Sequence, residues 1–98
     1  MLFRSVPVEP LGAPGSAETL IRTVRDRAAV LVAFEQLGGA DRALEMARDY
    51  ALERFAFGRP IGSLQAIKHM LADMYVSATL ARSNAYYGAW AQIGRAHV

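Results

Sequence analysis

Proline is absent from residue 15 to residue 59, and this gap constrains the fold more than any other feature. Within it, apolar side chains recur at steps of three and four residues: Leu20, Val24, Ala28, Leu31 and, further on, Leu37, Ala40, Leu44, Ala47, Ala51 and Phe55. Such steps are typical of one face of an α-helix, and the Ser16 hydroxyl can cap its first N–H groups. We therefore predict a helix over residues 16–56, about 60 Å long at 1.5 Å per residue.

A second helix is expected after Pro60. Gly58 can take the left-handed conformation common just beyond a helix end, so residues 56–62 are predicted to form a turn. Over residues 63–92 one face again carries apolar residues at helical steps: Ile67, Leu71, Met74, Ala78, Ala81, Ala85 and Ala89. Because a short turn makes neighbouring helices antiparallel, the predicted fold is a long all-α helical hairpin.

The predicted inner positions are dominated by alanine and by the Gly38-Gly39 pair, so the two helices bury little area and cannot close a core alone. Pro7, Pro10 and Pro14 make residues 1–15 an extended lead-in, because proline fixes φ and removes backbone donors. The sequence therefore predicts a hairpin that needs partners.

Composition excludes several classes of function. The chain has no cysteine, which removes disulfide scaffolds, thiolate zinc sites and cysteine nucleophiles. A net charge of +2 is too small to indicate nucleic-acid binding. No apolar run is long enough for a membrane span or a signal peptide. We expect a cytoplasmic protein that binds neither nucleic acid nor membrane.

Few side chains outside the predicted turn could carry chemistry. His69 and Asp73 stand four residues apart on one helix face, but two ligands without a third do not make a metal site. Tyr86 and Tyr87, near Trp90, could stack on a ligand ring, although aromatic residues on an alanine-rich helix are usually packing groups. The sequence contains no nucleophile and base pair, no carboxylate dyad and no glycine-rich phosphate loop.

The predicted turn brings together side chains that could hold a phosphate. Arg54 lies in the last turn of the first helix and Gln65 in the first turn of the second, beside a helix N-terminus. A guanidinium, an amide and free N–H groups together suit an anionic ligand. The alternative is that Arg54 and Arg59 neutralise the C-terminal carbonyls of the first helix while Gln65 is solvated. From the residues alone, the second interpretation is favoured.

The stretch around the turn also carries a specific pattern. Arg54, Phe57 and Gly58 form an Arg-x-x-Phe-Gly turn, Gln65 follows seven residues past the glycine, and Leu-Ala-Asp-Met occupies residues 71–74. This pattern resembles the C-terminal helical domain of the acyl-CoA dehydrogenase family. The resemblance implies that the hairpin is the first two helices of a four-helix bundle.

A second segment extends this resemblance toward the N-terminus. Val-Pro-Val-Glu at residues 6–9 is similar to the segment by which that family's chain leaves a middle β-domain. The resemblance thus covers residues 5–92. It implies that residues 1–15 lead in from a middle domain and that residues 16–92 are a partial C-terminal domain.

In that family the whole enzyme removes a proton from Cα and a hydride from Cβ of an acyl-CoA thioester. The product is the trans-2-enoyl-CoA, and flavin adenine dinucleotide (FAD) is the acceptor, bound at a subunit interface. The resemblance implies that Arg54 and Gln65 contact the pyrophosphate and adenosine portion of the FAD held by a neighbouring subunit, with Phe57 packed nearby. It also implies a homodimer or homotetramer.

The sequence departs from the family at two positions near the substrate. Ala29 stands where the family usually has an arginine, and Arg27 lies on a different helix face. Ala28 stands where some members place a carboxylate base, and alanine cannot take a proton. We therefore assign no catalytic residue, and the resemblance implies a base on a later loop beyond residue 98.

The last six residues break the family pattern. Residues 93–98 can be read as ATC GGA AGA GCA CAC GTC, which looks like an in-frame translation of a sequencing-library adapter. We expect a non-native tail on a fragment that is inactive alone. Two alternatives stay open: a free-standing helical hairpin that serves as an oligomerisation module, and a fragment of a related acyl-CoA oxidase or flavin monooxygenase.

Overall fold

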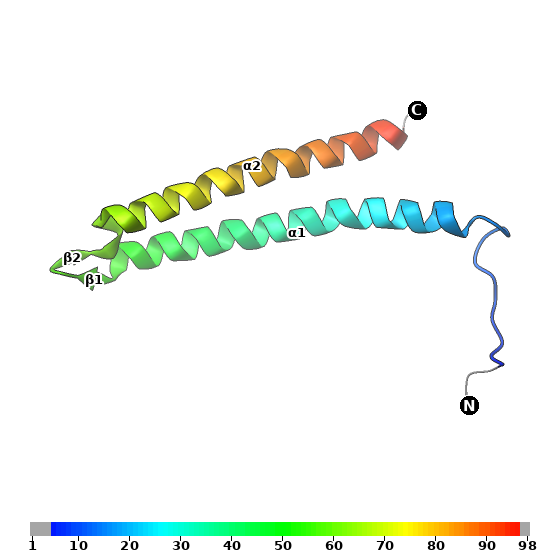
Figure 1. The fold of residues 1–98 in the computed structure, drawn as a ribbon, viewed down its shortest axis with the longest axis horizontal. Helices are drawn as coiled ribbons and strands as arrows, with labels where there is room; N and C mark the ends of the chain where they lie inside the picture. Colours follow the sequence, from blue (N-terminus) through cyan, green and yellow to red (C-terminus); the bar gives the residue numbers. More distant parts are fainter. Residues whose placement is uncertain (1–4, 97–98) are drawn as a thin grey trace.

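Two long antiparallel helices joined by a tight corner make up the computed structural model, which describes residues 5–96 (Figure 1). Helix α1 spans Ala17–Glu53 and α2 spans Gln65–Ala96. Between them lie β1 (Phe55–Ala56), β2 (Arg59–Pro60) and the 3-10 helix η1 (Ile61–Ser63). The predicted all-α hairpin is confirmed.

The helix ends differ from the prediction by a few residues. α1 ends at Glu53 because the backbone of Arg54 is extended, with φ −80° and ψ 129°, and the next two residues enter a strand. α2 continues to Ala96, so the structure has no helix break at residue 93. The origin of the tail stays a prediction, and its last two residues, His97 and Val98, lie outside the described part.

Ser16 does not cap α1 as predicted. Its backbone is helical, with φ −87° and ψ −4°, and its side chain makes no capping hydrogen bond. The Ser16 hydroxyl donates instead to the carbonyl oxygen of Ala13 at 2.6 Å. The backbone N–H of Ser16 donates to the same oxygen at 3.1 Å, so the side chain closes the turn before the helix.

The two helices meet along a narrow seam. Leu37, Ala51 and Ala85 are the buried apolar residues of the described part, with exposed fractions of 7%, 3% and 7%. Seam residues recur every seven positions on both helices: Leu37, Leu44 and Ala51 on α1, and Leu71, Ala78 and Ala85 on α2. This spacing keeps one side of each helix against the other over several turns, as in a coiled coil.

Two side-chain contacts cross the seam near its middle. The rings of Phe34 and Tyr86 pack edge to face with centroids 5.2 Å apart, which agrees with a packing role for Tyr86. The guanidinium of Arg82 donates to the carboxylate of Asp41. This ion pair joins α1 to α2.

The N-terminal part of α1 presents its apolar side chains away from the seam. Leu20, Val24 and Leu31 are 41%, 58% and 72% exposed, so these apolar residues are not buried between the two helices. The reason is the six-residue step from Leu31 to Leu37, which rotates the apolar stripe by about 100° from the position that a seven-residue repeat would keep. Gly38 and Gly39, predicted to be inner residues, are exposed as well.

The hairpin is extended and leaves much apolar surface uncovered. Its radius of gyration is 22.6 Å, against about 13 Å for a compact domain of this length. Neither helix, within the residues described, is apolar enough over 18 residues to cross a bilayer.

We predict that Leu37→Ala unfolds the hairpin more readily than Leu80→Ala. Leu37 is 7% exposed and leaves a cavity in the seam, whereas Leu80 is 62% exposed on α2. The free energy of unfolding should fall by about 2 kcal/mol for Leu37→Ala and by under about 0.5 kcal/mol for Leu80→Ala. Urea unfolding followed by circular dichroism measures both. Equal losses would show that the seam does not hold the helices together.

Candidate functional site

The corner between the helices begins where Arg54 leaves α1. The Arg54 N–H still donates to the carbonyl of Tyr50 at 2.9 Å, as the last helical bond would. The Arg54 carbonyl turns the other way and accepts from the Ile61 N–H at 2.7 Å. These two bonds fix Arg54 between the end of α1 and the segment that returns to α2.

A two-residue turn connects the short strands. Phe55 pairs with Pro60 and Ala56 with Arg59, which leaves Phe57 and Gly58 at the tip. Both tip residues have positive φ, 55° and 76°, as a type I′ hairpin turn requires. Gly58 takes this conformation freely, but a phenylalanine does so at a cost. The Phe57 side chain is 93% exposed, so no contact within the described hairpin repays that cost.

The return path packs closely against the end of α1. A Cβ added at Gly62 would lie 3.0 Å from the Ala51 carbonyl oxygen and 3.3 Å from the Ala51 Cβ. Ala51 itself is 3% exposed. The Ser63 hydroxyl donates to the Pro60 carbonyl at 2.6 Å, which fixes the 3-10 turn. The corner is therefore held by backbone contacts rather than by a large apolar core.

α2 starts at Gln65 without a side-chain cap. The preceding residue, Leu64, has no polar side-chain atom, and the Ser63 hydroxyl is used on Pro60. The first backbone bond into the helix runs from the Lys68 N–H to the Leu64 carbonyl at 3.0 Å. The N–H groups of the first turn therefore remain available to an acceptor from outside the helix.

The structure brings the three predicted residues to one end of the molecule. Arg54, Phe57 and Gln65 all lie on or beside the corner, and all three side chains are exposed. Within residues 5–96, neither the Arg54 guanidinium nor the Gln65 amide makes a hydrogen bond or an ion pair. A free cation, a free amide and free helix N–H groups suit an anionic, hydrogen-bonding ligand. Their contact with a flavin stays a prediction.

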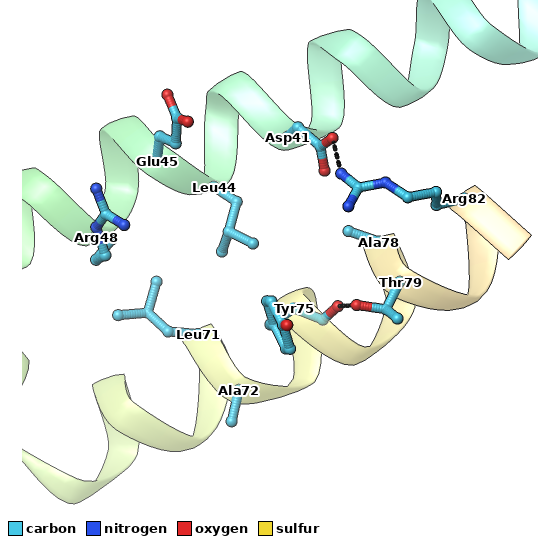
Figure 2. Close-up of a pocket in the computed structure, with 10 residues that line it drawn as sticks. All are labelled: Asp41, Leu44, Glu45, Arg48, Leu71, Ala72, Tyr75, Ala78, Thr79 and Arg82. Atoms are coloured by element: carbon cyan, nitrogen blue, oxygen red, sulfur yellow. Dashed lines mark hydrogen bonds and ion pairs between the residues drawn. The ribbon is translucent and has the colours of Figure 1, made fainter.

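A second concave feature, missed by sequence reasoning, lies on one side of the seam (Figure 2). Leu44, Leu71 and Ala78 point into this groove from the two helices, and the Arg82–Asp41 pair closes one end. No sequence signal could have found that pair, because the partners are 41 positions apart and meet only through the register of the helices. The groove contains no nucleophile and base pair.

Residues 5–96 contain no cluster of side chains that could hold a metal ion. In the described part of the chain, no three His, Cys, Asp or Glu side chains lie close enough together to hold an ion. His69 and Asp73 therefore have no third ligand beside them.

Comparison with known proteins shows what the hairpin is part of. The family model of the acyl-CoA dehydrogenase C-terminal domain matches residues 19–96, which include both helices and the corner. The chain belongs to the acyl-CoA dehydrogenase family. The predicted resemblance is therefore confirmed for the family and for its C-terminal domain.

Several acyl-CoA dehydrogenases match in sequence. Acyl-CoA dehydrogenase IpdE2 of Mycobacterium tuberculosis is 52% identical over 60 residues, 61% of this chain and 19% of that protein. An acyl-CoA dehydrogenase of Bacillus subtilis is 48% identical over 58 residues, 59% of this chain and 15% of its own length. The human mitochondrial short-chain specific enzyme is 39% identical over 72 residues, 74% of this chain and 18% of its own. The chain thus spans less than a fifth of the length of these relatives.

We predict that Gly62→Ala destabilises the corner. The new methyl group would press on the Ala51 backbone at 3.0 Å, and the backbone cannot move aside as a flexible side chain can. The free energy of unfolding should fall by about 1–3 kcal/mol. Gly88→Ala is the matched control, since a Cβ there meets nothing within 4 Å in the described structure. Thermal unfolding of both variants makes the comparison, and an unchanged Gly62→Ala melting temperature would contradict the close approach.

We predict the opposite sign for Phe57→Asn. Asparagine adopts positive φ more readily than phenylalanine and is favoured beside glycine in a type I′ turn. The exposed Phe57 ring loses no packing on removal, so stability should rise by roughly 0.5–1 kcal/mol. Chemical denaturation measures the change. Phe57→Leu, which keeps an apolar side chain at positive φ, should give no gain, and a gain as large as that of asparagine would contradict the backbone argument.

Proposed function

We propose that this chain is part of a flavin-dependent acyl-CoA dehydrogenase, to which it contributes the corner between its helices. Arg54 and Gln65 would contact the FAD bound by a neighbouring subunit, and Phe57 would pack beside it. The full enzyme would convert an acyl-CoA thioester to the trans-2-enoyl-CoA, and FAD supplies the hydride acceptor when it is bound. The observation that carries this proposal is the set of unpaired polar groups at the corner.

The charge balance of the corner supports an anionic ligand. The Arg54 guanidinium is not paired with a carboxylate within residues 5–96. A guanidinium can donate two parallel N–H bonds to one phosphate group. Arginine therefore suits a pyrophosphate better than lysine, whose ammonium group acts as a point charge. The free N–H groups at the start of α2 favour the same sign of charge.

The remaining two residues suit the rest of a dinucleotide. The Gln65 amide can both donate and accept, which fits the mixed donors and acceptors of a ribose or a base. Phe57 exposes a flat ring at a conformational cost, and a ring of this kind can pack against a heteroaromatic surface. Strain at a sparsely populated backbone conformation is typical of ligand contacts.

The chain offers no base for the proton abstraction. The family resemblance implies that Ala28 and Ala29 stand near the substrate, at positions where the family has ionisable groups, and a methyl side chain takes no proton. We therefore infer that the base comes from another segment of the full enzyme. The 98 residues alone should neither turn over an acyl-CoA nor bind FAD in the micromolar range.

A chimera tests the proposal. Residues 19–92 would replace the matching segment of the Bacillus subtilis relative, which shares 48% identity over 58 residues. Arg54→Ala should weaken FAD binding by about 10–100-fold, because charge-assisted hydrogen bonds contribute roughly 1.5–3 kcal/mol. The FAD affinity of Arg54→Lys should lie between those of the unchanged chimera and Arg54→Ala, since lysine keeps the charge but loses the bidentate geometry. FAD content per subunit and equilibrium titration of the apoprotein measure these changes.

Arg59→Ala is the matched control, because Arg59 is an exposed arginine of the same corner with no proposed FAD contact. It should change FAD affinity by less than about threefold. Circular dichroism and oligomer mass confirm that each chimera is folded. Equal losses for Arg54→Ala and Arg59→Ala, or no loss for either, would contradict the proposed contact.

A further inference from the structure

The loop that joins Arg54 to Gln65 has few side chains that could hold its shape. It is ten residues long, 55–64, and only Arg59 and Ser63 within it carry polar side chains. Its two strands have two residues each, and a strand pair of that length is marginal in water on its own. Arg54 and Gln65 therefore keep a fixed arrangement only if further contacts order this loop.

The Ser63 hydroxyl makes such a contact. It donates to the carbonyl oxygen of Pro60 at 2.6 Å, in a partly buried position. Partial shielding from water strengthens a hydrogen bond of this kind. A serine that donates to the carbonyl three residues back closes a turn with its side chain. The bond thus ties β2 to a residue only two positions before Gln65.

The same bond acts on Arg54 through one peptide group. The carbonyl of Pro60 and the N–H of Ile61 belong to that group, and they are held in one plane. The Ile61 N–H donates to the Arg54 carbonyl at 2.7 Å. The peptide group therefore has the Ser63 hydroxyl bound at its oxygen and the Arg54 carbonyl bound at its nitrogen. Neither bond can turn without turning the other.

The two bonds also strengthen one another. A donor on the carbonyl oxygen polarises the peptide group, so its N–H becomes a better donor to the next acceptor. The bonded series runs from the Ser63 hydroxyl through the Pro60–Ile61 peptide to Arg54. It ends at the residue whose guanidinium is proposed to reach the pyrophosphate.

On its other side, Ser63 leads directly into α2. The Leu64 N–H donates to the Ile61 carbonyl at 3.0 Å and closes the 3-10 turn around Ser63. The Lys68 N–H then donates to the Leu64 carbonyl at 3.0 Å and begins the helix that carries Gln65. Ser63 therefore stands between the two polar residues of the corner and is bonded toward both.

We propose that Ser63 is a positioning residue of the corner, whose hydroxyl sets the Pro60–Ile61 peptide and thereby the placement of Arg54 relative to Gln65. Ser63 acts on a bound flavin only through those two residues and does not touch it. The effect on flavin binding rests on the proposed function. The effect on the Ile61 N–H does not, because that bond lies within the chain.

Hydrogen exchange in the flavin-free chimera tests the bond itself. Ser63→Ala should speed exchange of the Ile61 N–H about fivefold, the usual effect of losing one neutral hydrogen bond. Ser63→Thr keeps the hydroxyl and should stay within about twofold. Ser83→Ala is the matched control, because it removes a serine bond to the Thr79 carbonyl on α2, and it should change nothing at Ile61. An unchanged rate in Ser63→Ala would overturn the proposal.

A double-mutant cycle tests the link to the ligand. In the chimera, Ser63→Ala should weaken FAD binding about fivefold, while Ser63→Thr and Ser83→Ala should each weaken it less than about twofold. In the Arg54→Ala background, the effect of Ser63→Ala should fall below about twofold, because the group that it positions is gone. Circular dichroism confirms that every variant compared is folded. A merely structural serine would give losses that add.

The two proposals fail in distinguishable ways. A loss of FAD affinity in Arg54→Ala but none in Ser63→Ala, or losses that add, overturns the role of Ser63 alone. Binding of FAD by Ser63→Thr that is as weak as in Ser63→Ala also overturns it, because the hydroxyl would then not be the group that matters. No loss in Arg54→Ala overturns the proposed function, and with it the effect of Ser63 on flavin binding.

Discussion

Two long helices stay antiparallel here because the side chains between them repeat every seven residues. Leu37 and Ala51 on α1 and Ala85 on α2 are the buried members of this seam. Their spacing fixes the register, and the register decides which end of α2 meets the end of α1. The corner follows from that register: Gly62 rests on the Ala51 carbonyl, and the Arg54 carbonyl is bound by Ile61. Without the seam, α1 and α2 would not lie side by side beyond the corner.

The seam is also narrow, and this accounts for the extended shape. Alanine at half of its positions brings the helices together but removes little apolar area from water per residue. α1 also carries apolar side chains outside the seam, among them Leu31 and Met46, which are 72% and 57% exposed.

Most of the fold could be predicted from the sequence, since its signals are local. The proline gap, Gly58 and the helical steps were sufficient for two helices and a turn. The sequence contains the six-residue step from Leu31 to Leu37, but helical periodicity alone does not show which of the two apolar runs faces α2. Ser16 does not act as the predicted cap because its backbone is helical rather than extended, which is not the conformation of an N-cap residue. The Asp41–Arg82 pair depends on tertiary register, which no local pattern encodes. The corner residues came from the family pattern, and the structure adds that they are exposed and unpaired.

The central claim is that the corner contacts a flavin of the neighbouring subunit. A crystal or cryo-EM structure of the FAD-bound chimera measures this most directly. We expect an Arg54 guanidinium nitrogen to lie about 2.7–3.0 Å from a pyrophosphate oxygen of the FAD held by the adjacent subunit, with Gln65 in hydrogen-bonding contact with the same cofactor. A structure in which FAD is bound while Arg54 caps the carbonyls at the end of α1 or extends into solvent would contradict it.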